Sequence, residues 1–393
     1  MQNRHFGIDI HKDFVVIAAV NRDQKVIQSP MRVDMSNLVH WAERTLGSQD
    51  RCVIEVTNNA WHVHDLLITY AGQVVVANPY KTKLIATARI KSDKIDALVL
   101  ARLLASNFIY EVTVPDHAMR QHRQLSAHYT SLTKKLRRIK AQIHALLNRR
   151  NLRCPTQDVF STAGRTWLEQ LVLTPIEVSV LNQLLAQLDL IEQQRDETDR
   201  LVAQLAADDD RVPRLMQIAG INYFTAFALL AAIGDIRRFS TSGQLASYFG
   251  LVPSLHQSGN QTYSGHITRA GNSQVRWLMV EAAWNAVRWD SHWKQVYERL
   301  KQRRGAGIAI VAVARKLLVV VWHLLHDHSI YYHLKPAMFV RKLQEWAWRI
   351  GRHHLQQANS IDFVHQHLKS IGLYDLVIRL TTNKKGKLKL RPA

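Results

Sequence analysis

The chain has 393 residues, and its 52 Lys and Arg outweigh its 31 Asp and Glu, which gives a formal net charge of +21. This length allows a sizeable core and two or three domains, and the charge favours a polyanionic partner, with nucleic acid first, over a basic surface kept only for solubility. The two cysteines, Cys52 and Cys154, argue against a disulfide scaffold or a Cys-based zinc site and suit a reducing compartment.

Neither the N-terminus nor the longest apolar run predicts a membrane protein. The N-terminus lacks the charged-then-apolar pattern of a secretory leader. The run 308–325 carries Arg315 and Lys316 in its middle, which is typical of a buried core helix. We expect a cytoplasmic protein that is not associated with a membrane.

Residues 1–112 alternate between strand and helix patterns and predict an α/β domain. A three-strand meander comes first, and strands then alternate with helices. The expected strands cover 6–10, 14–20, 25–28, 52–56 and 74–77, and the expected helices cover 36–46 and 61–71. Asn78 and Pro79 end the last strand, and a basic connector follows up to residue 91.

Residues 113–208 predict a helical hairpin or an oligomerising coiled coil. A very basic helix is expected over about 120–153, and a second long helix over 175–207 has leucines at helical spacing. The segment 155–164 breaks the pattern between them.

Residues 209–330 predict a mainly α-helical third domain, and 331–393 a C-terminal region of no assigned role. The start of the third domain, 215–221, resembles a helix-hairpin-helix in which Gly220 would present backbone N–H groups to a phosphate; an ordinary helix–helix turn explains it equally well. The basic tail 383–393 is expected to touch backbone phosphate.

Histidines are frequent in the C-terminal region, and they include His353, His354, His365 and His367. No Cys pair or metal-type spacing accompanies them. We therefore expect surface histidines in preference to a zinc site.

Four carboxylates stand out in the first domain. Asp9 and Glu55 lie inside expected strands, where an ionised acid is costly unless it is paired or metal-bound. Asp93 and Asp96 are three residues apart and share one face of a helix start. Taken singly, each has a plain explanation, since acids in a first helical turn favour the helix dipole and strand-end acids often face solvent.

Taken together, the four carboxylates predict a metal site. Hard carboxylate oxygens that converge on one point suit Mg²⁺ or Mn²⁺. Two such ions can activate an attacking oxygen and stabilise a leaving oxygen at a phosphodiester. An acidic cluster in a basic chain makes sense if DNA is held while metal ions assist its cleavage.

The strings GIDIHKD, IEVT, NPYKTK and SDKIDALVLARLL resemble the N-terminal DEDD domain of the insertion-sequence one-hundred-ten (IS110) family of bacterial transposases, which also includes Piv-type DNA invertases. The resemblance implies a RuvC-like, ribonuclease-H-type fold whose carboxylate tetrad is Asp9, Glu55, Asp93 and Asp96. One departure is the segment 57–60, Thr-Asn-Asn-Ala, where relatives usually have Thr-Gly and an aromatic. It touches no carboxylate but can reshape the neighbouring loop.

The second half of the chain resembles the C-terminal transposase domain of the same family. The matching pattern is Gly250-Leu-Val-Pro, then Ser258-Gly, then 265–272 and a helix with Arg276. The resemblance implies that Ser258 is the nucleophile. The residues alone favour a polar surface loop over a catalytic serine, although His256, His266, Arg269 and Arg276 lie nearby in sequence, and Ser254 and Ser264 are alternative serines.

The resemblance implies a DNA transposase or site-specific recombinase that cleaves strands with metal and Ser258, forms a covalent phosphoserine link and exchanges the strands. It also implies a homo-oligomer, a dimer or a tetramer, in which the carboxylates of one chain can meet the serine of another, and a non-coding guide RNA of the element that pairs with DNA.

Three alternatives stay open. A RuvC-like junction-resolving endonuclease would use metal-activated water and need no serine. A sugar-kinase or actin-like ATPase also has an Asp on its first strand, but the turn 11–13 lacks the expected Gly-rich phosphate loop. A non-catalytic nucleic-acid-binding protein would bind DNA without cutting it.

Overall fold

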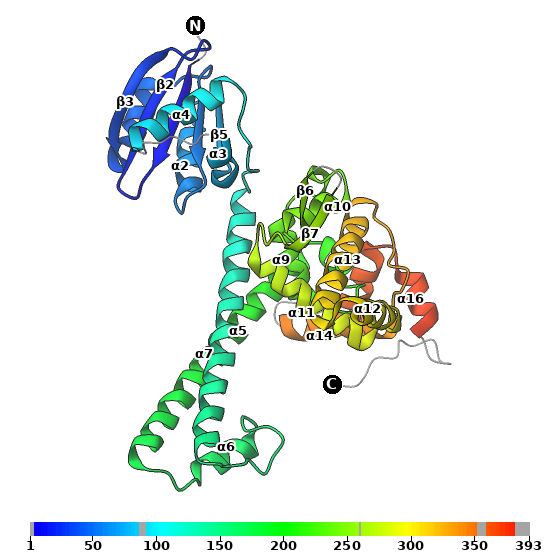
Figure 1. The fold of residues 1–393 in the computed structure, drawn as a ribbon. Helices are drawn as coiled ribbons and strands as arrows, with labels where there is room; N and C mark the ends of the chain where they lie inside the picture. The colour runs from blue at the N-terminus through cyan, green and yellow to red at the C-terminus, as the bar shows by residue number, and fades with distance from the viewer. Residues whose placement is uncertain (1–3, 86–91, 259–260, 352–358, 382–393) are drawn as a thin grey trace. The chain divides into compact units, whose positions relative to one another are not determined.

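The computed structural model describes residues 4–85, 92–258, 261–351 and 359–381 (Figure 1). The chain divides into two compact units, residues 1–116 and 117–393. The tail 383–393 lies outside the described residues, so its contact with phosphate stays a prediction. The finer boundaries after residues 208 and 330 also stay predictions.

The first unit is built on a five-stranded mixed sheet. Its strand order is β3-β2-β1-β4-β5, with β1, β2 and β3 antiparallel and with β4 and β5 parallel to β1. The strands are β1 (His5–Ile10), β2 (Phe14–Val20), β3 (Val26–Asp34), β4 (Arg51–Glu55) and β5 (Gln73–Ala77). The three-strand meander and the two later strands are confirmed.

Helices cover both faces of this sheet. Apolar side chains of α1 (Leu38–Thr45) and α2 (Ala60–Leu67) pack on one face, against Phe6 and Ile8 among others. On the other face lies α4 (Asp93–Ala105), whose Leu100 and Leu104 pack against Val53 and Val75. Because both faces are covered, the inner strands are apolar on both sides, as the sequence pattern shows.

Two segments of the first unit differ from the sequence expectation. β3 does not stop at Gln28 but runs to Asp34, because it is an edge strand and the missing N–H of Pro30 is tolerated there. The basic connector begins as a helix, α3 (Pro79–Ile85), because proline is favoured at a first helical position. A short 3₁₀ turn (Met35–Asn37) precedes α1.

The second unit begins with a long helical hairpin. α5 (His117–Arg149) and α7 (Pro175–Ala207) pack together and share an apolar cluster with the short helix α6 (Thr162–Glu169), which begins at the end of the predicted break. Thr174 and Glu177 form a capping box at the start of α7, where Pro175 is the first helical residue. The two long helices are confirmed.

The rest of the second unit is a helical bundle with one β-hairpin. Its elements are α8 (Arg211–Leu215), α9 (Tyr223–Ile233), a 3₁₀ turn (Ile236–Arg238), α10 (Ser242–Tyr248), β6 (Pro253–Ser258), β7 (Gln261–Ile267), α11 (Ser273–Trp289), α12 (Ser291–Arg304), α13 (Ala306–His326), α14 (Pro336–Ile350), α15 (Ser360–Ser370) and α16 (Tyr374–Thr381). One apolar core joins α9 to the helices up to α16, so the C-terminal region is part of the bundle.

α13 contains the apolar run 308–325. It is long and apolar enough to span a membrane by length and composition, and the core helix of a soluble protein passes the same test. Residues such as Leu317 and Val321 are fully buried in the bundle core, while Arg315 and Lys316 are exposed. The expected core helix is confirmed.

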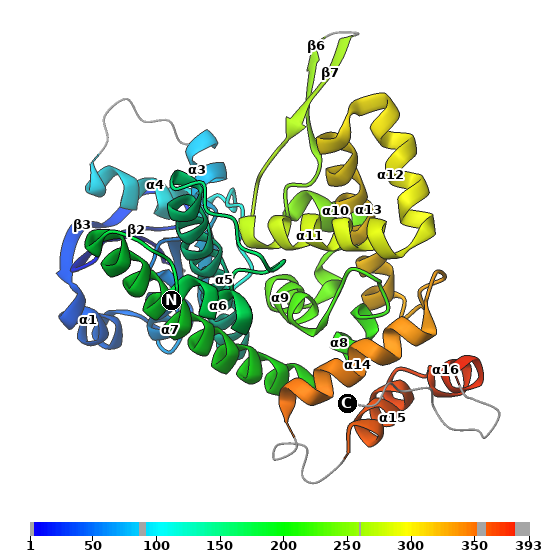
Figure 2. The same cartoon turned by 90° about the horizontal axis from the view of Figure 1, so that it is seen from below.

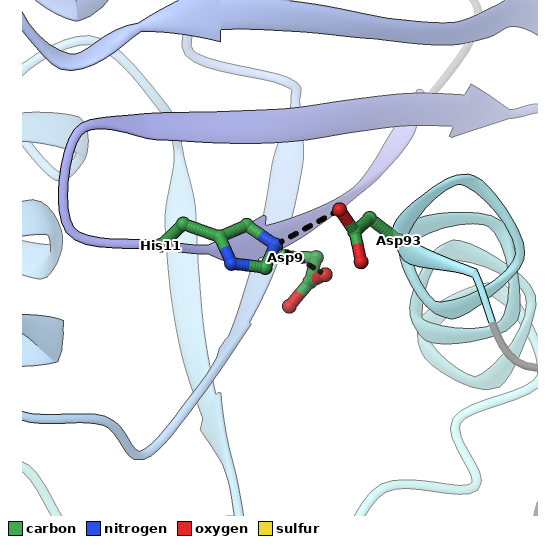
Figure 3. A group of neighbouring side chains, drawn as sticks. All are labelled: Asp9, His11 and Asp93. Carbon is green, nitrogen blue, oxygen red and sulfur yellow. Dashed lines mark hydrogen bonds and ion pairs between the residues drawn. The ribbon is translucent and has the colours of Figure 1, made fainter.

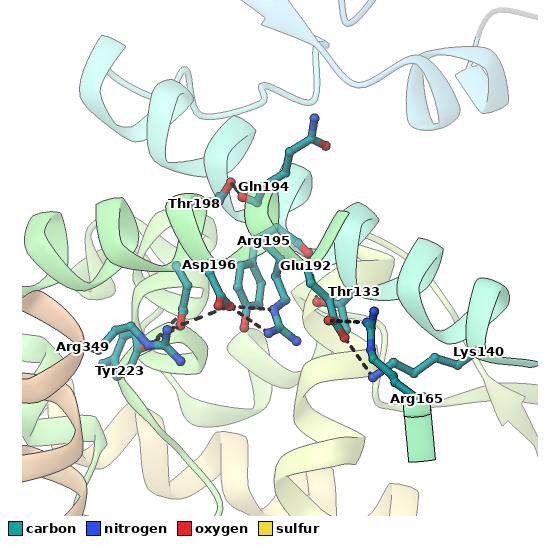
Figure 4. A network of polar contacts seen from close by, with 12 residues as sticks. Thr133, Lys140, Arg165, Glu192, Gln194, Arg195, Asp196, Thr198, Tyr223 and Arg349 are labelled. Atoms are coloured by element: carbon teal, nitrogen blue, oxygen red, sulfur yellow. Dashed lines mark hydrogen bonds and ion pairs between the residues drawn. The ribbon is translucent and has the colours of Figure 1, made fainter. Parts of the chain in front are cut away.

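A polar network fastens α7 to α9 and α14 (Figure 4). The buried carboxylate of Asp199 accepts a hydrogen bond from the Tyr223 hydroxyl at 2.8 Å and pairs with the Arg349 guanidinium at 2.9 Å. Burial nevertheless raises the pKa of Asp199, against the opposing effect of these two partners. Nearer the start of α7, Glu192 pairs with Lys140 of α5 at 3.0 Å.

Two contacts explain the turn between α8 and α9. A Cβ on Gly220 would lie 1.9 Å from the Ala282 carbonyl oxygen, so this glycine permits close packing against α11. The Lys342 ammonium donates to the carbonyls of Met216, Ile218 and Ile221, and desolvation lowers the pKa of Lys342 to about 7. Packing alone accounts for Gly220, and phosphate binding there stays a prediction.

The expectation of surface histidines in the C-terminal region is wrong for His367. Its ring is buried against Trp346, with 4.9 Å between ring centroids. Burial lowers the pKa of His367 to about 4, so this histidine is a neutral core residue. His365 is half-buried, and His353 and His354 lie outside the described residues.

Candidate active site

Two neighbouring strands place Asp9 and Glu55 on the same face of the sheet. A Cβ on Gly7 would lie 2.0 Å from the Ala97 carbonyl oxygen, so Gly7 faces α4, and Asp9 two residues later faces the same side. Val53 packs against α4, and Glu55 two residues later shares its side. The paired rungs of β1 and β4 end one residue before these acids, so both follow the last rung.

The N-terminus of α4 brings the other two carboxylates to this face. The Ser92 hydroxyl caps the helix by accepting from the Ile95 N–H at 3.4 Å, and Asp93 and Asp96 lie in the first turn. Here they favour the helix dipole, as the plain explanation says. The same placement brings Asp93 to His11, just after β1, and lets the charge of Asp96 act on Asp9.

His11 joins the carboxylates from β1 and α4 (Figure 3). Its Nε2 lies 3.2 Å from Asp9 Oδ2 and 3.3 Å from Asp93 Oδ2. One donor atom from each of the three residues lies within 4.8 Å of the others, which makes them a possible metal-binding group among the residues that the structure describes. The sequence reading treated His11 only as a turn residue; the signal available was its position two residues after Asp9.

The electrostatics of the group are those of crowded acids. Burial raises the pKa of Asp9; His11 opposes this shift, while the charges of Asp93 and Asp96 add to it. Asp96 is thus within electrostatic reach of Asp9. A positive charge placed among these residues would stabilise their ionised forms.

This donor set fits a divalent cation. Asp9 and Asp93 offer carboxylate oxygens on a common point, half-buried on one side and exposed on the other. Hard oxygen donors on a partly open site are what Mg²⁺ and Mn²⁺ take in enzymes that act on phosphates. Glu55 follows the last residue of β4 that pairs with β1, and the charge of Asp96 acts on Asp9; that these two acids share the site stays a prediction.

The segment 57–60, which departs from the family pattern, contacts this site. The Asn59 amide donates to the His11 carbonyl oxygen at 3.1 Å, and the Thr57 hydroxyl donates to the Asn59 side chain at 3.0 Å. The loop therefore holds the backbone of His11.

Ser258 lies in the second unit, at the end of β6. The sequence reading gave a polar loop for this region, but β6 and β7 form an antiparallel hairpin that extends from the helices of its unit (Figure 2). In the register, Ser258 pairs with Gln261 and Ser264 pairs with Leu255. Leu255 and Tyr263 are 66% and 60% exposed, so strand alternation gives no apolar face for a sequence reading to detect.

Arg276 holds the base of the hairpin. Its guanidinium donates to the carbonyls of Phe249, Ala270 and Gly271 at 3.3, 2.6 and 3.1 Å. Gly271 has a φ of +67°, and a Cβ there would lie 2.1 Å from the Tyr248 carbonyl oxygen. The sequence analysis noted Arg276 only because it lies near Ser258 in sequence; in the structure its guanidinium binds the backbone at the base of the hairpin.

Two family models match separate parts of the chain. A DEDD transposase model of the IS110 type matches residues 6–151, and the model described as "Transposase IS116/IS110/IS902 family" matches residues 212–298. The first match covers Asp9, Glu55, Asp93 and Asp96. The second covers Ser258.

Several curated proteins are similar over part of their length. A probable family 20 transposase of Pseudomonas aeruginosa is 32% identical over 39% of this chain and 46% of its own, and the transposase for insertion sequence element IS1111A of Coxiella burnetii is 34% identical over 42% and 46%. The transposase for insertion sequence element IS1328 of Yersinia enterocolitica is 25% identical over 59% and 71%. The chain thus spans about half the length of the first two relatives.

Proposed function

Because the chain belongs to the IS110/IS116/IS902 family of transposases, we propose that it is a DNA recombinase that cuts and rejoins strands at the ends of an insertion sequence. The observation that carries the proposal is the convergence of Asp9 and Asp93 on His11 at the carboxyl end of β1. A half-buried carboxylate such as Asp9 is costly to ionise unless it is paired or holds a metal ion.

The first unit is proposed as a RuvC-like, ribonuclease-H-type catalytic domain. The strand order, with an antiparallel meander followed by two parallel strands, supports this fold. Asp9, Glu55, Asp93 and Asp96 would hold Mg²⁺ or Mn²⁺ near a phosphodiester. When bound, such ions stabilise charge on the attacking and leaving oxygens.

Ser258 is proposed as the nucleophile. Its Oγ would attack phosphorus and lose its proton to a base; a phosphoserine bond forms as the bond to the leaving DNA oxygen breaks, and that oxygen takes up a proton. A second attack by the incoming strand end then releases the serine. In the backbone register Ser258 pairs with Gln261 and Ser264 with Leu255, so the two serines hold different positions along the hairpin, and the test below distinguishes them.

The partners are proposed from charge and family. DNA is the substrate, and the exposed basic side of α5, with Lys134, Lys135 and Arg138, is a suitable backbone-contacting surface. A homo-oligomer and a non-coding guide RNA rest on the family resemblance. A chain that acts on chromosomal DNA would work in the cytoplasm at the nucleoid.

The test is a trap for a covalent protein–DNA adduct. Joined element ends, Mg²⁺ and RNA from cells that carry the locus are incubated with wild type, Ser258→Ala and the matched control Ser264→Ala, and then run on a denaturing gel. We expect an adduct with wild type and Ser264→Ala only. Cleavage without an adduct in all three supports the junction-resolving nuclease, and DNA binding without cleavage supports a non-catalytic binding protein; either outcome overturns the proposal.

A further inference from the structure

We propose that His11 is a direct ligand of the catalytic metal, so that the centre is a mixed nitrogen–oxygen site that prefers Mn²⁺ to Mg²⁺. The inference rests on the proposed metal site and goes beyond it, because the carboxylate tetrad alone supplies only oxygen donors. It concerns which ion this protein takes and which residue selects it.

The separations around His11 suit a shared ion. Two neighbouring ligands of an octahedral ion with bonds of about 2.1–2.2 Å lie about 3.0–3.1 Å apart. His11 Nε2 lies 3.2 Å from Asp9 Oδ2 and 3.3 Å from Asp93 Oδ2. The donor atoms of the group lie within 4.8 Å of one another, so a small closure brings all three to bonding distance. Nε2 is the nitrogen that faces both carboxylates (Figure 3).

His11 is also held in place from several sides. The backbone N–H of His11 donates to the Phe14 carbonyl at 2.9 Å across the β1–β2 turn. The Asn59 side-chain amide donates to the carbonyl of His11 at 3.1 Å. The imidazole stacks on the Phe14 ring, with 4.4 Å between centroids and 22° between planes. A side chain that backbone and ring contacts already hold in place is suited to binding a metal ion, because little further conformational entropy is lost when the ion binds.

The chemistry of the donors sets the preference. Mg²⁺ is a hard cation that takes oxygen ligands and gives up its waters reluctantly. Imidazole nitrogen is a normal ligand for first-row transition ions. Mn²⁺ binds imidazole nitrogen as such an ion does, and it also binds carboxylate oxygens well. One nitrogen among oxygens at this site therefore favours Mn²⁺ over Mg²⁺, while still admitting Mg²⁺.

The test measures ion binding without DNA. Mn²⁺ is titrated into the full chain and followed by loss of the free-ion electron paramagnetic resonance signal, and Mg²⁺ affinity is obtained by competition. The proteins are wild type, His11→Ala, His11→Gln and the matched control His62→Ala, an exposed histidine of α2 in the same unit. Circular dichroism checks that each variant is folded.

We expect His11→Ala and His11→Gln to lose about tenfold or more in Mn²⁺ affinity, and about threefold or less in Mg²⁺ affinity, while His62→Ala matches wild type. Pulsed resonance on bound Mn²⁺ should show coupling to a nitrogen nucleus that is absent from both His11 variants. Equal losses for both ions, or no nitrogen coupling in wild type, would mean that His11 only orients the carboxylates and would overturn the proposal.

The result is separable from the proposed function. Nitrogen coupling without any strand cleavage would support His11 as a metal ligand and overturn the proposal that the protein is a recombinase. A serine adduct formed with Mg²⁺, together with bound Mn²⁺ that shows no nitrogen coupling, would keep the recombinase and remove the ligand.

Discussion

The carboxylate group and the β6–β7 hairpin are supported in different ways. Asp9 and Asp93 are carried by β1 and α4, two elements in close backbone contact at Gly7 and packed over a buried core. Ser258 is carried by a two-stranded hairpin on which Leu255 and Tyr263 are exposed and whose base is held by the hydrogen bonds of Arg276. One support is made of packing, the other of polar contacts to backbone.

The difference suits the two tasks proposed for them. Donor atoms for a metal must be held to within about half an ångström, which packed strands and helices achieve better than loops. A nucleophile that has to reach a phosphate can stand on a projecting ribbon, provided that the base of the ribbon is fixed. Substitutions in the two supports should therefore affect different measurements.

Asp9→Asn should give the largest effect, since it removes one charge from the metal site while keeping its shape. We expect strand cleavage to fall by about a thousandfold or more and Mn²⁺ affinity to fall with it. Cleavage of labelled element ends is the measurement, and Asp13→Asn, an exposed acid of the same β1–β2 turn, is the control. Unchanged cleavage by Asp9→Asn would show that this unit is not catalytic.

Gly7→Ala tests the packed support. Its Cβ would meet the Ala97 carbonyl oxygen at 2.0 Å and the Ala101 nitrogen at 2.4 Å, so α4 must move away from β1. We expect the free energy of unfolding to fall by about 1–3 kcal/mol and metal affinity to fall as Asp93 shifts. Gly307→Ala is the control, since a Cβ there has open space in α13. The measurements are chemical denaturation and Mn²⁺ titration. Equal stability and equal Mn²⁺ affinity in the two variants would refute the expectation.

Arg276→Met tests the polar support. Loss of the guanidinium leaves the carbonyls of Phe249, Ala270 and Gly271 without this donor, so the hairpin base loosens. We expect adduct formation to fall by about tenfold to a hundredfold with Mn²⁺ binding unchanged. Arg303→Met, an exposed arginine of α12, should match wild type. A fall in Mn²⁺ affinity would contradict the separation of the two supports.

Lys342→Met should give the smallest effect on cleavage and Mn²⁺ binding, because the Lys342 ammonium binds backbone carbonyls within the second unit and acts on the stability of that unit and on the pH dependence of that stability. The folded-state pKa of Lys342 is about 7, below its unfolded value, so between pH 7 and about 10 the unfolded state holds more protons and stability rises with pH. The slope from this group is at most about 1.4 kcal/mol per pH unit. Urea unfolding of the second unit at pH 7.5, 8.5 and 9.5 should show this rise in wild type and its loss in the variant.

The apolar patterns predicted much of the fold. Strands β1, β2, β4 and β5 and helices α5, α7 and α13 have strong periodicity, because each buries a face in a core. The β6–β7 hairpin has no such signal, since exposed Leu255 and Tyr263 give no buried side to either strand. The sequence does not predict α3, because a proline such as Pro79 is compatible both with the end of a strand and with the first position of a helix.

The sequence indicates which residue types form the candidate site, but not its geometry. Asp9, Glu55, Asp93 and Asp96 could be singled out because acids within apolar strands and in a helix start are distinctive. His11 could not, because its role depends on how β1 meets the first turn of α4, a contact between residues far apart in sequence. The sequence singles out Arg276 only because it lies near Ser258 along the chain. In the structure its guanidinium instead donates to backbone carbonyls at the base of the hairpin.

The apolar helix α13 has a consequence for synthesis of the chain. α8, α10, α11 and α12 pack against it, and each of them leaves the ribosome earlier. When the apolar helix α13 leaves the ribosome, the helices that pack against it have therefore already been synthesised. This limits the time during which α13 can aggregate or be recognised as a membrane anchor. A nascent chain released within α12 would lack α13 altogether and expose the apolar faces that wait for it.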